Sequence, residues 1–568
     1  MKHSRATLPV RRLAAALLGA LVVTGGAAPP SQAGIVSAAH PAAVQAGLDV
    51  LAAGGSAVDA AVAVQFVLGL VEAPESGPGG GAFLLHYDAA SGALSVHDGR
   101  ETAPAGITPE QFTWLGGRAL PHVLAVPGGR AVGVPGLVAM LGEAHAVHGR
   151  LPWAELLAPA IALAEAGHAP APRLRRQLRG DPTLWLFRDV RRYFFRWPGR
   201  PADTLHDPEA VATLRALAED GPRAFYHGAI AEAVAARAAR GWQAGTLTPE
   251  DLADYRPETR EPLCGPYRQW RICGVPPPSS GGLAVLQILG MLEQFPMGEL
   301  AERRAEALHL VAEASRLAFA DRAAWVGDPA FTDIPLEALL APEYLAMRGA
   351  LIDPHQALPA AEPGRDIGAS DRSGGTSHFT VIDAAGNIAT VTSSIEAPFG
   401  SRRRAAGFLL NNQLTDFDFT VTSTAGPPGQ QAPNLPAPGK RPRSSMSPIM
   451  VFDAEGEPLL AFGARGGSRI IGHVVRVLIA TLDWGLPLEA AFAEANFLHR
   501  GQHLEIERGS AAEGYAAALR GYGHRVRRHD MPSGLHGVER TPEGWRGAAD
   551  PRLDGDARTT HGEAMLEP

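Results

Sequence analysis

The chain has 568 residues, with 51 Lys plus Arg against 59 Asp plus Glu, which gives a formal net charge of −8. This length exceeds that of one ordinary domain, and the hydrophobic content of 46% allows a large buried core. The mild acidity argues against a nucleic-acid partner, which would require a basic face. Because the 20 histidines and two cysteines show no spacing typical of a metal site, we expect no metal and no cofactor.

The N-terminus has the three parts of a secretory signal peptide. Basic residues precede a short apolar stretch at 13–23, and Ser31-Gln32-Ala33 offers a small-x-small cleavage site. The apolar stretch is too short to span a bilayer. We therefore predict a signal peptide at 1–33, no membrane anchor, and a periplasmic or secreted mature protein. The alternative is a buried N-terminal helix.

The next part of the chain reads mainly as helix. Ser56 can cap a helix that follows Gly54-Gly55, with Asp59 three residues further on. A hairpin is predicted at 83–87 and 94–97. Helical periodicity predicts helices at 40–53, 56–70, 136–148, 156–166, 208–219 and 305–324.

The two cysteines lie in the segment PLCGPYRQWRICGV. If Arg268-Gln269 forms the turn of a hairpin, Cys264 and Cys273 face each other across its two strands. In an oxidising compartment this arrangement allows a disulfide, and two free buried thiols fit the sequence equally well.

Strand patterns dominate the second half. A polar, Gly-rich segment at 359–375 precedes strands at 378–382 and 388–395. A second hairpin is predicted at 447–452 and 458–462. Strands between helices predict an α+β fold in which helices cover the sheets.

The dipeptide Gly375-Thr376 stands where the Gly-rich segment meets the first of these strands. Cleavage there would expose Thr376 as an N-terminal residue that holds both a hydroxyl nucleophile and an α-amine. An α-amine has an ordinary pKa of about 7.7–8.0, so it can act as the general base. The alternative is an ordinary strand start.

Gly466-Gly467 opens a predicted helix, where backbone N–H groups point outward. They can stabilise an oxyanion. The alternative is a tight strand-to-helix turn.

Several polar residues suit a zwitterionic amino acid. Arg100 can pair with a carboxylate. Hydroxyl donors and acceptors for an ammonium group are provided by Ser444, Ser445, Glu396, Gln413 and Asp416. Each of these residues, taken singly, is more often an ordinary surface residue.

Taken together, these stretches resemble the γ-glutamyltransferase (γ-glutamyl transpeptidase) family. The motifs that carry the resemblance are GGSAVDAAVAVQFVLGLVEAPESGPGGGAFL, HDGRETAP, PPPSSGG, AEASRLAFADRAAWVGDPAF, TSHFTVIDAAGNIATVTSSIEAPFG, GFLLNNQLTDF, KRPRSSMSP, GGSRII and AADPR. The resemblance implies an N-terminal-nucleophile (Ntn) hydrolase: an αββα four-layer sandwich with two stacked, mainly antiparallel sheets. It further implies self-cleavage before Thr376 into a large subunit, 34–375, and a small catalytic subunit, 376–568, which stay associated.

The resemblance also implies the chemistry. Thr376 would attack glutathione or another γ-glutamyl compound and pass the γ-glutamyl group to water or to an amino-acid or peptide acceptor. By similarity, Gly466 and Gly467 hold the oxyanion and Ser394 supports the nucleophile. The same similarity places Arg100, Ser444 and Ser445 on the substrate α-carboxylate, and Glu396, Gln413 and Asp416 around its α-amine.

The sequence departs from the family pattern at four places. Glu396 stands where many relatives have Asn, and Ser394 where Thr is more familiar. Arg465 replaces a Pro before the glycine pair, where it would face either the leaving group or solvent. The Pro-rich segment 424–440 has the length of a lid over the site but lacks a Tyr.

Two other functions remain as alternatives. A glutaryl or cephalosporin acylase of the same fold would share Thr376 and the glycine pair. Its substrate has no α-amine, so Asp416 and Glu396 would be left without a partner. An exported amino-acid-binding protein would stay uncleaved.

Overall fold

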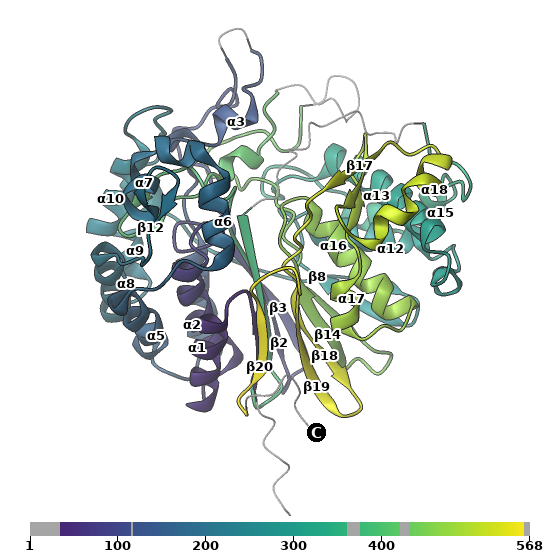
Figure 1. The fold of residues 1–568 in the computed structure, drawn as a ribbon, viewed down its shortest axis with the longest axis horizontal. Helices are drawn as coiled ribbons and strands as arrows, with labels where there is room; N and C mark the ends of the chain where they lie inside the picture. The colour runs from purple at the N-terminus through teal and green to yellow at the C-terminus, as the bar shows by residue number, and fades with distance from the viewer. Residues whose placement is uncertain (1–33, 115–116, 360–374, 421–430, 562–568) are drawn as a thin grey trace, which may run out of the picture. The chain divides into compact units, whose positions relative to one another are not determined.

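Two antiparallel sheets stack face to face between two layers of helices, as Figure 1 shows. The computed structural model describes residues 34–114, 117–359, 375–420 and 431–561. All of them belong to one compact unit, Gln32–Pro568. The predicted signal peptide and residues 360–374 of the Gly-rich segment lie outside the described residues. The αββα sandwich expected from the resemblance is confirmed.

The first sheet has seven strands in the order β20-β1-β9-β10-β2-β3-β6. Their bounds are β1 Ile35–Ala38, β2 Gly81–Asp88, β3 Ala93–Gly99, β6 Glu258–Arg260, β9 Gly375–Ile382, β10 Ile388–Glu396 and β20 Asp556–Thr559. The strands β9 and β10, which form the predicted hairpin, lie at its centre.

The second sheet has six strands in the order β19-β18-β14-β13-β8-β7. Their bounds are β7 Leu263–Tyr267, β8 Trp270–Gly274, β13 Ile449–Phe452, β14 Pro458–Gly463, β18 His536–Thr541 and β19 Gly544–Ala549. In the β7–β8 hairpin Cys264 pairs with Cys273, and a disulfide joins them, which decides between the two alternatives that the sequence leaves open.

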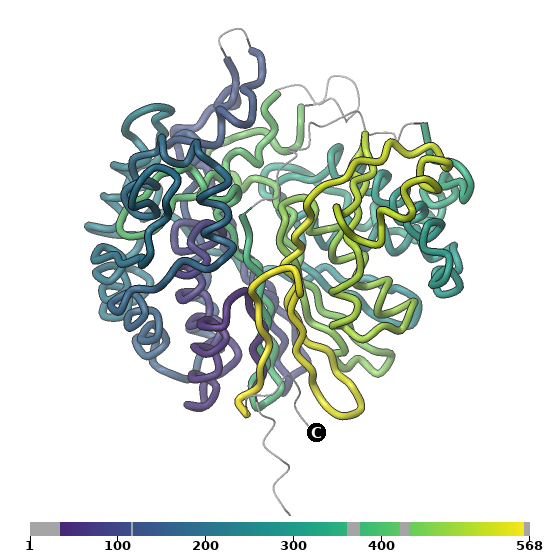
Figure 2. Tube along the Cα trace, in the orientation of Figure 1, coloured from purple at the N-terminus to yellow at the C-terminus, as the bar shows by residue number. Residues whose placement is uncertain are grey.

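Helices cover the outer faces of both sheets. On the side of the first sheet lie α1 Pro41–Ala52, α2 Ala57–Val71 and α4 Leu137–His148, with α5 Trp153–Ala166 and α8 Pro208–Asp220 farther out. On the side of the second sheet lie α12 Gly281–Leu292, α13 Arg304–Trp325, α16 Arg469–Leu478 and α17 Leu488–Ala493. The tube in Figure 2 shows that the purple N-terminal and yellow C-terminal ends of the described chain meet in the sheets, where β1 pairs with β20. The predicted helices are confirmed to within a few residues.

Shorter elements complete the fold. They are α3 His122–Ala125, α6 Pro172–Gly180, α7 Arg188–Phe194, α9 Arg223–Tyr226, α10 Ala229–Ala238, α11 Pro249–Ala253, α14 Leu336–Leu340, α15 Pro342–Gly349, α18 Ala516–Gly521, β4 Phe195–Trp197, β5 Arg200–Pro201, β11 Arg404–Ala405, β12 Phe408–Leu409, β15 Phe497–His499, β16 Leu504–Glu507 and β17 Val526–His529.

Strand alternation explains how each sheet fills two cores. In β9, Phe379 and Val381 pack against the first helical layer, whereas Ile382 packs into the core between the sheets. Successive side chains of a strand point to opposite faces, so a doubly covered sheet must be apolar on both. The N-terminal cap of α2 is also as predicted, because Ser56 and Asp59 form a reciprocal capping box.

The helix after Gly466-Gly467 is shorter than its apolar pattern indicates. The α-helix ends at Leu478, and a π-helical turn, Ile479–Asp483, continues the buried stripe. None of the helices within the described residues is both long and apolar enough to cross a membrane.

Candidate active site

The predicted nucleophile lies at the edge of the first sheet, where β9 begins. Thr376 pairs with Ser394 on β10, and Gly375 pairs with Glu396, so a bulge at Ile395 interrupts the register. The bulge changes the direction of the strand and leaves Glu396 with a φ of 75°. As a result, Glu396 does not follow the regular alternation of sheet faces that the sequence indicates.

Three groups at this position form a continuous hydrogen-bond chain. The Thr376 hydroxyl donates to Ser394 Oγ over 3.3 Å, and Ser394 Oγ donates to the Gly375 carbonyl oxygen over 2.6 Å. The backbone N–H of Glu396 also donates to Ser394 Oγ, over 2.9 Å. Gly375 and Thr376 belong to one strand, so this is the geometry of the uncleaved chain. A proton can pass from the nucleophile to Ser394 while Ser394 polarises the carbonyl before Thr376.

The glycine pair follows β14 and opens α16. Gly466 and Gly467 have φ values of 126° and 60°, a backbone conformation that favours glycine. The end of β14 lies close to the nucleophile strand, because a Cβ on Gly463 would come within 2.4 Å of the His378 ring. The Gly466-Gly467 turn therefore follows a strand, β14, that contacts β9 at His378, two residues beyond Thr376.

Arg465, directly before the glycine pair, is buried, so the solvent-facing alternative is wrong. Its Nη2 donates to Glu75 Oε2 over 2.6 Å. Glu75 also accepts from Arg173 Nη2 over 2.5 Å, and a Cβ on Gly375 would lie 3.0 Å from Glu75 Oε2. Burial acts to raise the pKa of Glu75, but the Arg173 and Arg465 guanidiniums lower it below its usual value. An ionised Glu75 therefore links the residue before Thr376 to the glycine turn.

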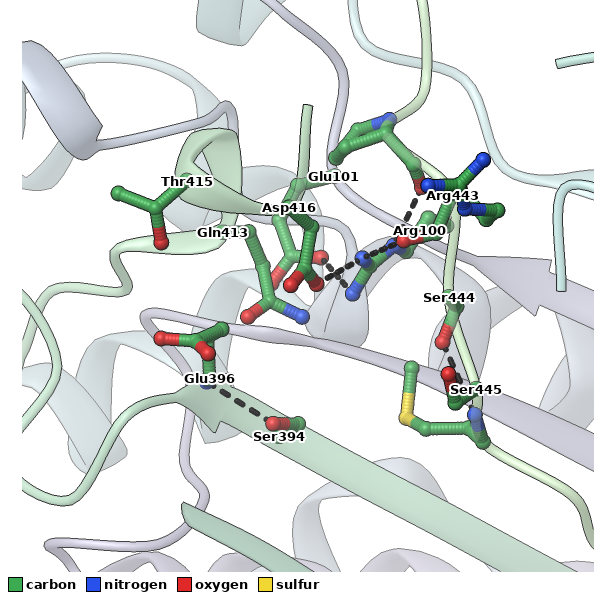
Figure 3. A network of polar contacts seen from close by, with 12 residues as sticks. Arg100, Glu101, Ser394, Glu396, Gln413, Thr415, Asp416, Arg443, Ser444 and Ser445 are labelled. Atoms are coloured by element: carbon green, nitrogen blue, oxygen red, sulfur yellow. Dashed lines mark hydrogen bonds and ion pairs between the residues drawn. The ribbon is translucent and has the colours of Figure 1, made fainter. Parts of the chain in front are cut away.

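The predicted substrate residues gather beside this edge, as Figure 3 shows. Arg100 Nη2 donates to Asp416 Oδ2 over 2.6 Å and to the Arg443 carbonyl oxygen over 3.0 Å. Its Nε donates to the Pro442 carbonyl oxygen over 3.0 Å, and Nη1 lies 3.5 Å from Glu101. The guanidinium that sequence reasoning assigns to a substrate carboxylate is thus already held by the protein.

Glu396 and Gln413 lie on the other side of Asp416 from Arg100 (Figure 3). Asn412 Nδ2 donates to Glu396 Oε2. Burial raises the pKa of Glu396 to about 8, and the Asp416 charge adds to this effect. Burial likewise raises the pKa of Glu101 to about 8, although Arg100 acts in the opposite direction. The group therefore has more carboxyl groups than cations, and a bound cation would favour their ionised forms.

Two serine hydroxyls face this group from the segment before β13 (Figure 3). Ser444 Oγ accepts from the Met446 backbone N–H over 3.1 Å, and Ser445 Oγ accepts from Arg322 Nη2 over 3.0 Å. A hydroxyl oxygen that accepts a hydrogen bond can still donate its own hydrogen to another group. Both serines are therefore set as donors.

The Pro-rich segment 424–440, which is long enough to form a lid, lies partly outside the described residues. Of the described part, Asn434 Nδ2 donates to the Asp416 carbonyl oxygen over 2.7 Å, and Asn434 Oδ1 accepts from the Arg443 N–H over 2.8 Å. This part of the segment is therefore fixed to the site.

His378 has a structural role, as a buried and hydrogen-bonded side chain. Its Nδ1 lies 2.8 Å from Thr392 Oγ1, and burial lowers its pKa well below the usual value, so the ring stays neutral. Sequence reasoning gave no role to Glu75, Glu101 or Arg322, although all three lie inside quoted motifs: Glu75 in GGSAVDAAVAVQFVLGLVEAPESGPGGGAFL, Glu101 in HDGRETAP and Arg322 in AEASRLAFADRAAWVGDPAF.

One group of described residues has ligand atoms close enough to hold a metal ion: Glu313, His499 and His524. The Glu313 carboxylate already accepts from Arg316 Nη1 over 2.9 Å and from the Leu358 N–H over 2.7 Å. The absence of a metal from the reaction stays a prediction.

Comparison with known proteins identifies the family. The γ-glutamyltranspeptidase family model matches residues 43–560. The chain is 35% identical over 511 residues to the glutathione hydrolase proenzyme of Bacillus subtilis strain 168, covering 87% of this chain and 85% of the relative. It is 36% identical over 536 residues to the acylase ACY 1 proenzyme of Pseudomonas sp. strain SE83, covering 92% of each.

The fold is shared with a solved structure of cephalosporin acylase from Bacillus halodurans. The TM-score is 0.81 at 29% identity, and the match covers 93% of this chain and 95% of that one. Since the family model spans most of the sequence and these relatives match over nearly their full lengths, the chain belongs to the γ-glutamyltranspeptidase family.

Proposed function

We propose that this protein is a self-processing γ-glutamyltransferase and glutathione hydrolase that uses Thr376 as its nucleophile. The observation that carries the proposal is the hydrogen-bond chain from the Thr376 hydroxyl through Ser394 to the Gly375 carbonyl oxygen. It joins the nucleophile and the carbonyl that must be attacked for Thr376 to become an N-terminus.

In the processing step, Thr376 Oγ attacks the Gly375 carbonyl carbon while its proton leaves toward Ser394. The C–N bond to Thr376 breaks, the amine takes up a proton, and an ester to Thr376 Oγ remains. Water then hydrolyses this ester. The products are the Gly375 carboxylate and the free Thr376 amine, so the large subunit is 34–375 and the small subunit is 376–568.

In turnover, the neutral Thr376 amine accepts the hydroxyl proton as Oγ attacks the γ-carbonyl of the substrate. The N–H groups of Gly466 and Gly467 stabilise the oxyanion. The leaving amine takes up a proton, and a γ-glutamyl ester remains on Thr376. Water releases glutamate, whereas an amino-acid or peptide acceptor gives a new γ-glutamyl amide.

The site distinguishes two amide classes by charge. Glu396 and Asp416 surround a space that suits an ammonium group, whose charge would favour the ionised form of Glu396. A glutaryl group lacks this ammonium and would leave Glu396 without a cation beside it, whereas Asp416 would keep only its ion pair with Arg100. Similarity to ACY 1 and to the cephalosporin acylase structure keeps acylase activity as the second candidate.

An uncleaved amino-acid-binding protein is the third candidate. Binding would need the polar pocket alone, and the contacts between Thr376, Ser394 and Gly375 would then serve no purpose.

The proposal is tested by hydrolysis of a γ-glutamyl anilide and the matched glutaryl anilide, with protein lacking residues 1–33. Preference for the γ-glutamyl compound supports the proposal. Preference for the glutaryl compound supports the acylase, and an uncut chain with no activity on either supports the binding protein.

We also propose export to the periplasm or the medium, without a membrane anchor. The disulfide between Cys264 and Cys273 supports an oxidising compartment. Fractionation of cells that express the full chain, followed by mass measurement of the mature N-terminus, tests this location.

A further inference from the structure

The segment 173–200 has a local charge that the composition of the whole chain hides. It contains nine arginines and two aspartates, which gives a formal charge of +7 in a chain whose net charge is −8. The arginines are Arg173, Arg175, Arg176, Arg179, Arg188, Arg191, Arg192, Arg196 and Arg200. A surface with so much charge of one sign attracts partners of the opposite sign.

Four of these arginines are already held by the protein. Arg173 pairs with Glu72 and Glu75, and Arg196 lies 3.4 Å from Asp203. Arg175 Nε donates to the Pro170 carbonyl oxygen over 3.0 Å, and Arg191 Nη1 donates to the Trp185 carbonyl oxygen over 3.1 Å. These contacts explain why the four side chains are present without a partner molecule.

The other five are exposed, and their guanidiniums have no ion-pair or hydrogen-bond partner among the described residues. They are Arg176, Arg179, Arg188, Arg192 and Arg200. Like charges on one surface repel each other, and an anionic partner would remove this repulsion. The fold itself therefore does not account for these five arginines.

The five arginines belong to elements that pack around one small core. The helices α6 and α7 and the hairpin β4–β5 enclose the buried side chains Leu174, Leu178, Val190, Phe194 and Phe195. Arg176 and Arg179 are three residues apart on α6, and Arg188 and Arg192 are four apart on α7, so each pair shares the exposed face of its helix. Figure 1 shows both helices in the layer on the side of the first sheet.

Two large apolar side chains are exposed in the same segment. Leu186 ends a 3₁₀ helix, Pro182–Leu186, just before α7 and is 74% exposed; Trp197 ends β4 and is 63% exposed. A soluble anion needs arginines but not exposed Leu and Trp. Basic residues beside exposed Leu and Trp are typical of a surface that lies at the boundary between lipid headgroups and acyl chains. We call the five unpaired arginines with Leu186 and Trp197 the arginine surface.

We propose that the arginine surface binds reversibly to a membrane surface that is rich in anionic phospholipid. The guanidiniums contact lipid phosphates, which suit their forked donor geometry, while Leu186 and Trp197 enter the headgroup boundary. Such binding is adsorption to one face of a bilayer and needs no membrane-spanning segment. It is also independent of the reaction that Thr376 carries out.

The test is co-sedimentation of protein lacking residues 1–33 with vesicles. One set contains phosphatidylglycerol mixed with phosphatidylcholine, and the other contains phosphatidylcholine alone. We expect binding to the anionic vesicles only, and release at about 1 M salt, where the screening length falls to about 3 Å.

Two double variants separate the charged and apolar contributions. Each basic side chain near an anionic membrane strengthens binding about fivefold, so Arg188→Gln/Arg192→Gln should weaken it about twentyfold. Leu186→Ser/Trp197→Ser should weaken it about tenfold, and the remaining binding should be more sensitive to salt. Both variants should keep the parent kcat/KM for a soluble anilide, which shows that they fold.

Arg525→Gln/Arg527→Gln is the matched control. These two arginines lie at the start of β17, and both are exposed without an ion-pair or hydrogen-bond partner among the described residues. The control removes the same charge as Arg188→Gln/Arg192→Gln but from another part of the surface. It should bind anionic vesicles about as tightly as the parent.

Three results would overturn the inference. The first is equal binding by the parent and Arg188→Gln/Arg192→Gln, and the second is an equal loss in the control, which would make net charge the cause. The third is binding to duplex DNA at least as tight as to anionic vesicles, with no effect of Leu186→Ser/Trp197→Ser, because the surface would then select a soluble polyanion rather than a membrane.

Discussion

The Ser394 hydroxyl donates to the Gly375 carbonyl oxygen over 2.6 Å while it accepts the Thr376 hydroxyl over 3.3 Å. One serine thus contacts both the nucleophilic hydroxyl and the oxygen of the carbonyl group that this hydroxyl must attack. Its side chain is 4% exposed, so water does not readily replace it.

Ser394→Ala should slow self-cleavage by about tenfold or more, because the developing oxyanion loses a buried donor. Ser394→Thr keeps the hydroxyl and should cleave at nearly the parent rate. The appearance of the two fragments after expression, followed by gel and mass spectrometry, measures this. Parent-like cleavage in Ser394→Ala would remove Ser394 from the processing step.

The pH dependence of substrate preference should report on Glu396. Its pKa is raised to about 8, so in the free site it is mostly protonated at pH 6 and becomes ionised as the pH rises to 8. An ionised Glu396 attracts the substrate ammonium, so the ratio of kcat/KM for γ-glutamyl over glutaryl anilide should increase across this range. Titration of the Thr376 amine affects both substrates and cancels in the ratio.

Glu396→Gln is the matched variant for this measurement, and its ratio should rise less. Glu101 titrates in the same range and provides the control variant, Glu101→Gln, which should keep more of the rise. If the ratio does not change with pH in the parent, Glu396 does not contribute to recognition of the substrate amine.

Removal of one partner from the Glu75–Arg465 pair should destabilise the fold. Arg465→Met leaves Glu75 buried with only Arg173 as its counter-charge, a type of change that costs about 3–5 kcal/mol. The double variant Arg465→Met/Glu75→Gln should regain much of this loss. Chemical denaturation of the uncut Thr376→Ala background isolates the effect, and an additive double variant would mean that the two residues are not coupled.

The disulfide should contribute stability but not catalysis. It closes a loop with a sequence separation of 9, for which loop entropy gives about 2–3 kcal/mol. Cys264→Ser/Cys273→Ser should therefore melt at a lower temperature and keep the parent kcat/KM for the anilide. An unchanged melting temperature under oxidising conditions would contradict the stabilising role.

Features that depend on near neighbours in the chain were predictable from the sequence. The Cys264–Cys273 hairpin, the Ser56 cap and the β9–β10 hairpin follow from turn residues, capping chemistry and alternation. The bulge at Ile395 left no such mark, because TVTSSIE continues the alternation through it.

Contacts between distant parts of the chain were not predictable in this way. Arg465 and Glu75 are 390 residues apart, and Arg322 and Ser445 are 123 apart. Each is an ordinary charged or hydroxyl residue in its local context. Only folding brings them to the edge of the sheet where Thr376 lies, so their roles could be inferred only from the three-dimensional contacts.

The most direct test of the account is the mass of the small fragment after protein lacking residues 1–33 is mixed with γ-glutamyl anilide and quenched in acid. We predict a fragment of residues 376–568 that carries one γ-glutamyl group on Thr376, and no adduct on the large fragment. Turnover by a chain still uncut before Thr376, or an adduct on any other residue, would contradict the account.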